Sequence, residues 1–174
     1  MLITLNHLNN IYKEGPAEQR ALFYPYINFA MQQYDINLTK ARVAMFLAQI
    51  GHESGQLRYV EEIASGQSYE GRTDLGNVMP GDGVKFKGRG LIQITGRKNY
   101  SWCGNDLKLP LLTQPELLEQ PRWAALSAAW FWNRAGLNRF ADVGDLNTCT
   151  KLINGGFNGL TDRTLLYKRA LATL

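Results

Sequence analysis

A glutamate continues the apolar face of one predicted helix. The apolar side chains of that face recur three or four residues apart, at Val43, Phe46, Leu47 and Ile50. Glu53 falls on the same face one turn later, and Gly55 is expected to end the helix. Partial burial and the negative end of the helix dipole both favour a protonated carboxyl, which is what a general acid requires. The alternative is a solvated glutamate at a frayed helix end.

Acid–base chemistry with two carboxyl groups needs a partner for Glu53. Glu61, Glu62 and Glu70 lie in or beside the segment that follows, and Asp74 and Asp82 come later in it. Spacing alone does not choose among them, and each taken singly is more typical of a solvated surface charge.

Metal and phosphate chemistry find little support in the sequence. His52 precedes Glu53 as in a zinc-protease helix, but the position of the second histidine is Gln56, so we predict no metal site and a structural, hydrogen-bonded His52. Gly88 and Gly90 lack the third glycine of a phosphate-binding loop, because position 93 is glutamine. We therefore expect no cofactor.

A basic stretch is compatible with anionic partners. The net charge is +4, and the segment from Lys85 to Lys98 contains five basic residues and no acidic one. Nucleic acid, an anionic cell wall or a solvated surface would all fit this pattern. The two cysteines, Cys103 and Cys149, exclude a multi-bridge disulfide framework, and we interpret both as small core residues.

The elements that position these residues are mostly helices. Periodicity predicts helices from about Pro16 to Tyr34, from a Thr39 cap to near Gly55, from Pro121 through a buried tryptophan-rich segment to a break at Gly136, and over Asp145 to Ile153 and Thr161 to Leu174. The Gly, Ser, Asp and Pro content of residues 64–90 predicts a long loop, with a short hairpin around Pro80 to Gly83. Leu91 to Thr95 fits either a short strand or a first helical turn.

Length and composition fit one mainly α-helical domain spanning residues 1–174, with residues 1–37 as its N-terminal helical part. The 174 residues are 45 % hydrophobic, which is sufficient for a single core and argues against disorder. The apolar stretches are too short for a membrane helix. The first residues do not have the pattern of a cleavable export signal, so we expect the protein to be held first in the cytosol.

Four motifs occur in a fixed order and carry a family resemblance. They are FLAQIGHESG (46–55), KGRGLIQITGRKNY (87–100), ALSAAWFW (125–132) and INGGFNG (153–159). Over about residues 40–170 the sequence resembles glycoside hydrolase family 19, which comprises plant-type chitinases and many bacteriophage endolysins. The YEGRTDLGN (69–77) and PGDG (80–83) segments are more similar to the endolysin branch. The resemblance implies a lysozyme-like helical fold and inverting hydrolysis of β-1,4 bonds between N-acetylated sugars.

The resemblance also implies roles for individual residues. Glu53, in the HESG motif, takes the position of the general acid. With Tyr69 as the anchor, Glu62 takes the position of the general base, while Glu61 and Glu70 remain alternatives. Thr95 resembles the hydroxyl residue that helps to hold the attacking water. We expect the two carboxyl groups to lie about 6.5–9.5 Å apart, as inverting enzymes require.

Substrate-binding roles follow from the same motifs. Gln93, Asn99 and Tyr100 of the central motif, Asn154 of INGG, and Arg163 in the last helix resemble residues that line the sugar-binding groove. Asn154 fits a turn or helix cap nearly as well, because two glycines follow it.

We expect the substrate to be peptidoglycan, because an anionic polymer suits the basic stretch. The predicted protein is a monomeric endolysin that neither inserts stably into membranes nor binds nucleic acid. It would accumulate in the host cytoplasm before release to the periplasm or cell wall; a secreted effector would have the same features. The alternatives are a chitinase acting on neutral chitin and a non-catalytic wall-binding protein, and a transglycosylase-type product stays open.

Overall fold

The computed structural model describes residues 1–174, and nearly all of its regular structure is helical. The α-helices are α1 (Leu5–Ile11), α2 (Ala17–Gln33), α3 (Lys40–Glu53), α4 (Asp82–Lys85), α5 (Arg97–Leu107), α6 (Pro121–Arg134), α7 (Asn138–Asp142), α8 (Leu146–Asn154) and α9 (Leu160–Thr173). Short 3-10 helices are η1 (Ile36–Leu38), η2 (Gln67–Tyr69), η3 (Thr73–Leu75) and η4 (Pro115–Glu119). The mainly α prediction is confirmed.

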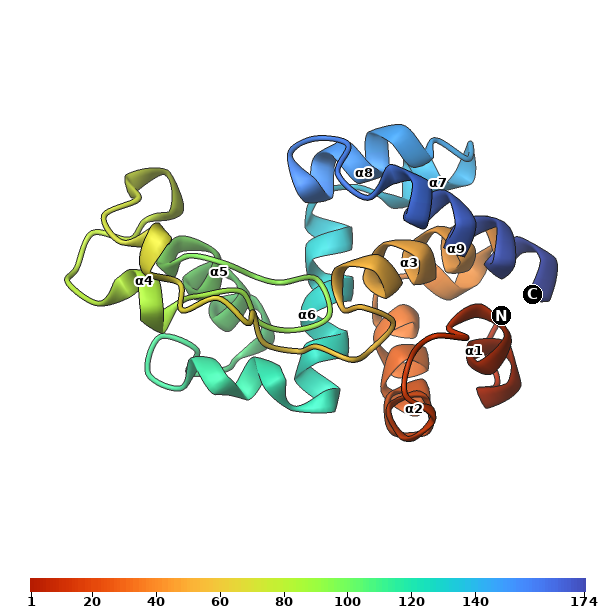
Figure 1. Cartoon of the computed structure of the whole chain (residues 1–174), viewed down its shortest axis with the longest axis horizontal. Coiled ribbons are helices and arrows are strands. Elements are labelled where there is room, and N and C mark those ends of the chain that lie inside the picture. The colour runs from red at the N-terminus through yellow and green to blue at the C-terminus, as the bar shows by residue number, and fades with distance from the viewer.

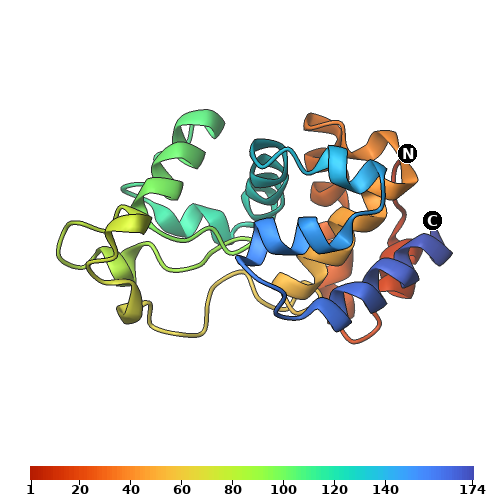
Figure 2. The same cartoon turned by 90° about the horizontal axis from the view of Figure 1, so that it is seen from above.

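The helices form two lobes joined along α6 (Figure 1). The large lobe contains α1, α2, α3, α7, α8 and α9, and both chain termini lie on its outer side (Figures 1 and 2). The small lobe consists of residues 60–119, including α4, α5 and the long irregular segments between them. None of the helices has the length and hydropathy that crossing a bilayer requires.

Helix α3 is the centre of the large lobe and carries Glu53 as its last residue. The predicted Thr39 cap is confirmed, since its Oγ1 accepts a hydrogen bond of 3.2 Å from the Arg42 amide. Residues 43–51 are all buried, because α3 packs against α9 on one side and against α6 through an edge-to-face contact of Phe46 with Trp132 on another. The predicted apolar stripe is thus part of a helix buried on most faces.

Helix α6 has the boundaries and the burial that the sequence predicts. It begins at Pro121, and residues 124–130 are buried between α2 and the small lobe. The predicted ends of α8 and α9 agree within one residue, with Asp145 as the N-cap of α8. Both cysteines are free and buried, as expected. Helices α5 and α7 were not predicted.

The predicted hairpin at Pro80 to Gly83 is wrong. The side chain of Asp82 accepts hydrogen bonds from the amides of Val78 and Met79 and pairs with Arg97, and these contacts start the short helix α4 instead. Leu91 to Thr95 forms neither a strand nor a helical turn. It is a tight turn closed by mutual backbone hydrogen bonds between Arg89 and Ile94.

Candidate active site

The site lies where the end of α3 meets two extended segments of the small lobe. Backbone hydrogen bonds link the two segments, from Glu62 to Gly88 at 2.9 Å and from Gly90 to Val60 at 2.8 Å. Two pockets adjoin here and share Gln93, and together we call them the cleft. The first pocket is lined by Glu53, Tyr59, Glu61, Glu62, Ile63, Ala64 and Gln93. The second is lined by Leu75, Ile92, Gln93, Ile94, Thr95, Asn99, Phe131 and Ile153.

Glu53 is held by a buried network rather than by apolar side chains. Its Oε1 accepts a hydrogen bond from Arg163, whose guanidinium is fully buried and also donates to Gln49. Gln49 in turn donates to the Thr150 hydroxyl at 3.1 Å. The Glu53 side chain is 16 % exposed and its Oε2 has no partner within the chain, so one oxygen is fixed and the other faces the first pocket.

Arg163 was predicted to contact substrate, and this prediction is wrong. Its side chain has no exposed surface, because α9 packs directly over α3. The residue therefore orients Glu53 and compensates its charge from behind. Without Arg163, the Glu53 carboxylate would face a buried surface that contains no cation.

Glu62 lies on the same pocket and is held by neutral donors. The Tyr69 hydroxyl donates to Oε1 at 2.9 Å and the Gly88 amide donates to Oε2 at 3.1 Å. Burial, followed by the hydrogen bond to Glu62, raises the pKa of Tyr69 above its usual value, so the phenol remains a donor at neutral pH. The carboxylate thus has a fixed orientation without an ion pair.

Glycine at position 88 lets three polar side chains converge. A Cβ atom there would lie 2.6 Å from Gln93 Oε1 and 3.3 Å from both Glu62 Oε2 and Thr95 Oγ1. The oxygens of the predicted base and of the predicted water-holding hydroxyl therefore converge beside Gly88.

Glu61 and Glu70 have different surroundings. Glu61 forms an ion pair with Lys87 at 2.9 Å and lies 3.7 Å from the guanidinium of Arg89. Glu70 accepts hydrogen bonds from the amides of Gly81 and Gly83 and does not line the cleft. The three candidate carboxylates therefore differ in their partners and in whether they line the cleft, which the sequence did not reveal.

Gln93, Thr95 and Asn99 line the second pocket with their polar ends. Gln93 adopts a left-handed backbone conformation (φ 58°), and its Nε2 donates to the Gly90 carbonyl at 3.0 Å. The Thr95 hydroxyl donates to the Gln93 carbonyl, and Asn99 donates to the Thr95 carbonyl. These bonds fix the three side chains, and the amide oxygens of Gln93 and Asn99 remain available to a ligand.

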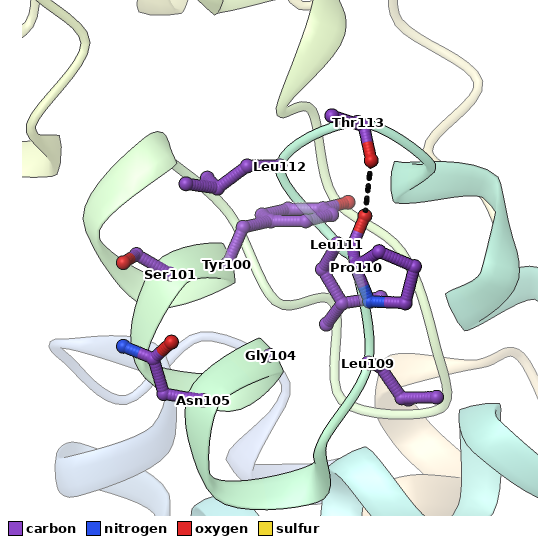
Figure 3. Close-up of a pocket in the computed structure, with 9 residues that line it drawn as sticks. All are labelled: Tyr100, Ser101, Gly104, Asn105, Leu109, Pro110, Leu111, Leu112 and Thr113. Carbon is purple, nitrogen blue, oxygen red and sulfur yellow. Dashed lines mark hydrogen bonds between the residues drawn. The ribbon is translucent and has the colours of Figure 1, made fainter.

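Tyr100 does not line the cleft, which corrects its predicted substrate-binding role. Its ring is buried between α5 and the segment Leu109 to Thr113, at a separate pocket on the small lobe (Figure 3). Its hydroxyl donates to the Lys87 carbonyl at 2.7 Å and accepts from Arg89. Tyr100 therefore supports the GRG segment from behind.

Asn154 is not one of the residues that line the cleft. It is the exposed last residue of α8, followed by Gly155 in the left-handed conformation (φ 77°) that commonly ends helices. The capping interpretation therefore fits the structure, and its neighbour Ile153 is the residue of α8 that lines the second pocket.

His52 is a structural group, as predicted. Its Nδ1 lies 2.7 Å from Asp162 Oδ2, and Gly159 approaches its ring so closely that any Cβ there would overlap it. The pairs His52 with Asp162 and Glu53 with Arg163 thus join consecutive residues of α3 to consecutive residues of α9. No group of three or more His, Cys, Asp or Glu side chains is arranged to hold a metal ion.

The basic stretch is largely neutralised, which the sequence did not predict. Lys87 and Arg89 pair with Glu61 and Glu119, and Arg97 pairs with Asp82. The partners come from other parts of the chain, so a count of charges along the stretch overstates the positive surface. Lys85 and Lys98 are exceptions, because neither forms an ion pair; the Lys98 ammonium donates to the Asp74 carbonyl instead.

A helical two-lobed fold with two differently held carboxyl groups on one pocket has the acid–base pair that a glycoside hydrolase requires. The sequence pattern of the family described as class I chitinase, glycoside hydrolase family 19, matches residues 21–142. The chain is 31 % identical over 172 residues to a glycosyl hydrolase family 19 domain-containing protein of Haemophilus influenzae, covering 78 % of this chain and 82 % of that protein. The chain therefore belongs to glycoside hydrolase family 19 and is a chitinase- or lysozyme-like glycoside hydrolase.

Plant relatives agree with this assignment, and solved structures agree with the fold. Endochitinase At2g43620 of Arabidopsis thaliana is 40 % identical over 131 residues, covering 73 % of this chain but only 44 % of that protein, so the chain spans less than half of that relative. A bacterial family 19 chitinase superposes with a TM-score of 0.82 at 21 % identity, over 99 % of this chain and 95 % of the other. A class IV chitinase of Zea mays superposes with a TM-score of 0.80 at 23 % identity, over 98 % and 92 %. The fold prediction is confirmed.

Proposed function

We propose that this protein is a peptidoglycan-degrading endolysin that cleaves β-1,4 bonds between N-acetylated sugars by inverting acid–base hydrolysis. The observation that carries the proposal is that Glu53 and Glu62 line one pocket in unlike surroundings. Two carboxyl groups with different partners can take the two different roles that inversion requires.

Glu53 acts as the general acid. Arg163 binds Oε1, so Oε2, the oxygen that faces the pocket, is the one from which a proton can be delivered. From there it passes to the glycosidic oxygen as the bond to the leaving sugar breaks. The buried network behind Arg163 keeps this oxygen in place during the transfer.

Glu62 acts as the general base. Its neutral donors leave the carboxylate able to accept a proton from water, and the Thr95 hydroxyl lies beside Gly88 together with Glu62 Oε2. Glu61 is a weaker candidate because Lys87 compensates its charge. A water activated by Glu62 attacks the anomeric carbon from the face opposite the departing oxygen, which inverts the anomeric configuration. Gln93 and Asn99 hydrogen-bond the sugar in the second pocket.

The acid–base assignment is tested by amide substitutions assayed on purified sacculi. E53Q and E62Q should each lower the rate by about 10²- to 10⁴-fold, because each removes one proton transfer. E61Q is the matched control and should retain most activity. NMR of the first product should show the inverted anomer. If E53Q still dissolves walls at the wild-type rate, Glu53 is not the general acid. A non-catalytic wall-binding protein would instead bind sacculi without releasing soluble fragments, with or without Glu53.

The substrate and product are tested separately. Relatives of this chain are named endochitinases, so chitin is the second candidate. Incubation with sacculi and with N-acetylglucosamine oligomers discriminates the two, and release from the oligomers alone would overturn the peptidoglycan assignment. Mass spectrometry of the muropeptides should show reducing ends, whereas anhydro ends would mean that a sugar hydroxyl replaces water.

The biological setting is tested in cells. We propose that the protein is a monomer that accumulates in the host cytoplasm and reaches the wall through a separate membrane lesion. Expression alone should leave the culture intact, and permeabilising the inner membrane should lyse it within minutes. Lysis without permeabilisation would contradict this route, and light scattering would measure the mass of the purified protein.

A further inference from the structure

A cluster of one aromatic and two cationic side chains lies on α5 and α6, the two helices that border the second pocket. Trp102 on α5 is 39 % exposed. The guanidinium of Arg134, at the end of α6, lies 4.3 Å from the centre of the Trp102 ring, and the ammonium of Lys98 lies 5.4 Å from it. All three residues are exposed. We call them the Trp102 cluster.

The cluster adjoins the second pocket. Asn99 of α5 and Phe131 of α6 both line that pocket. Trp102 and Arg134 each follow them by three residues, so both lie one helical turn further along on the same faces. The two helices lie side by side (Figure 2) and pack against each other. A polymer chain that leaves the second pocket between α5 and α6 therefore meets the Trp102 cluster.

The charges of the cluster lack carboxylate partners. Lys98 donates only to a backbone carbonyl, and Arg134 forms no ion pair. Asp106, one turn beyond Trp102 on α5, accepts a hydrogen bond of 2.7 Å from the Trp130 indole instead and is not paired with either cation. This contrasts with Lys87 and Arg97, which are neutralised by carboxylates. The cluster thus places two cations without carboxylate partners beside the second pocket.

The contact with Trp102 also restricts the Arg134 guanidinium. An arginine already held over an aromatic ring loses less side-chain freedom when it binds a carboxylate. The tryptophan offers its exposed surface to the apolar face of a sugar or to a peptide side chain.

We propose that the Trp102 cluster is a substrate subsite that binds a carboxylate on the lactyl-peptide substituent of peptidoglycan. The inference deepens the proposed function and rests on it. Chitin carries only uncharged N-acetylglucosamine and has no group for these cations, whereas alternate sugars of peptidoglycan carry an acidic substituent. The cluster therefore selects between the two polymers, although the cleft accepts the N-acetylated backbone of both.

The test compares three substrates and two matched arginine variants. R134Q removes the charge at the cluster, and R122Q removes an exposed arginine stacked on Phe29 and Trp123 at the opposite end of α6. Initial rates at low substrate concentration are measured on native sacculi, on sacculi whose carboxylates have been amidated with carbodiimide, and on N-acetylglucosamine oligomers. Thermal melting checks that both variants are folded.

R134Q should lose about tenfold on native sacculi, the range expected for one charge-assisted hydrogen bond, and less than about twofold on the two uncharged substrates. R122Q should stay within about twofold of wild type on all three. The selectivity of wild type for native over amidated sacculi should also shrink as salt is added. K98Q should show a smaller loss of the same kind.

The outcomes separate this inference from the function on which it rests. If wild type digests sacculi and R134Q loses nothing there, or loses equally on amidated sacculi, the subsite is refuted while the peptidoglycan assignment stands. If wild type fails on native sacculi but cleaves the oligomers, the peptidoglycan assignment fails, and the subsite fails with it.

Discussion

Replacing Gly88 by alanine tests whether the site depends on the close approach of three polar side chains. Gly88 does not have a positive φ, so its backbone accepts alanine without strain. The new methyl group would lie 2.6 Å from Gln93 Oε1, and at 3.3 Å it would press more lightly on Glu62 Oε2 and Thr95 Oγ1. The substitution therefore acts on the site rather than on the core.

The distance by which Gln93 Oε1 must move determines the expected loss of activity. Gln93 Oε1 must move by at least 0.8 Å to reach an ordinary contact of 3.4 Å from the methyl group. A misplacement of about 1 Å at a reacting centre costs on the order of 10²-fold in rate, so kcat/KM should fall by about that factor. Stability should change by less than about 1 kcal/mol, because the displaced group is the flexible end of a side chain and alanine restricts the unfolded chain.

The assay compares kcat/KM on sacculi with the melting temperature of the same preparations. G156A is the matched control, since Gly156 also lacks a positive φ and a Cβ there would meet only Asn154 Oδ1 at 3.9 Å. The control should keep both activity and stability. Wild-type kinetics in G88A would refute the idea that Glu62, Gln93 and Thr95 must converge at this point.

Three further predictions concern stability and reactivity. R163A should lower the free energy of unfolding by about 3–5 kcal/mol, because it leaves the partly buried Glu53 and the buried Gln49 without their cation. R169A removes an exposed ion pair with Glu14 and should lower it by less than about 1 kcal/mol; urea titration measures both values. Burial raises the pKa of Cys103 and Cys149 to about 12, so a thiol reagent at pH 8 should label them only when the protein unfolds, and fast labelling of the native protein would contradict their burial. The hydrogen bond from Arg97 lowers the pKa of Asp82 below its value in the unfolded chain, so the ion pair stabilises the fold above about pH 4 and this stabilisation is lost on acidification. D82N should therefore be less stable than wild type at neutral pH, and the difference in melting temperature should shrink in acid.

Local patterns were sufficient to predict the helices that carry strong signals. The Thr39 cap and the spacing from Val43 to Ile50 predicted α3, and Pro121 predicted the start of α6. Both signals depend on neighbours within one helical turn, which the sequence lists directly. The burial of α6 followed as well, because its tryptophans and alanines leave few polar positions.

Segments whose conformation depends on distant partners were not predictable. The Pro80 to Gly83 segment has the composition of a turn, but a short helix begins at Asp82, whose carboxylate is held by Arg97 and by the amides of Val78 and Met79. The neutralisation of the basic stretch has the same origin, since the partners of Lys87 and Arg89 are scattered along the chain. These ion-pair partners are far apart in the sequence, so they can be identified only once the fold is known.

The environment of Glu53 is the clearest case, and it changes how the site is understood. Helix periodicity placed the carboxyl at the edge of the core but could not identify the cation behind it. One signal was present in the sequence: Gln49 is a polar residue one turn before Glu53 on a helix that is otherwise buried, and such a residue needs a partner. That partner is Arg163, so the orientation of the acid depends on the packing of α9 against α3. Substitutions between these two helices should therefore reduce catalysis even where they touch no substrate.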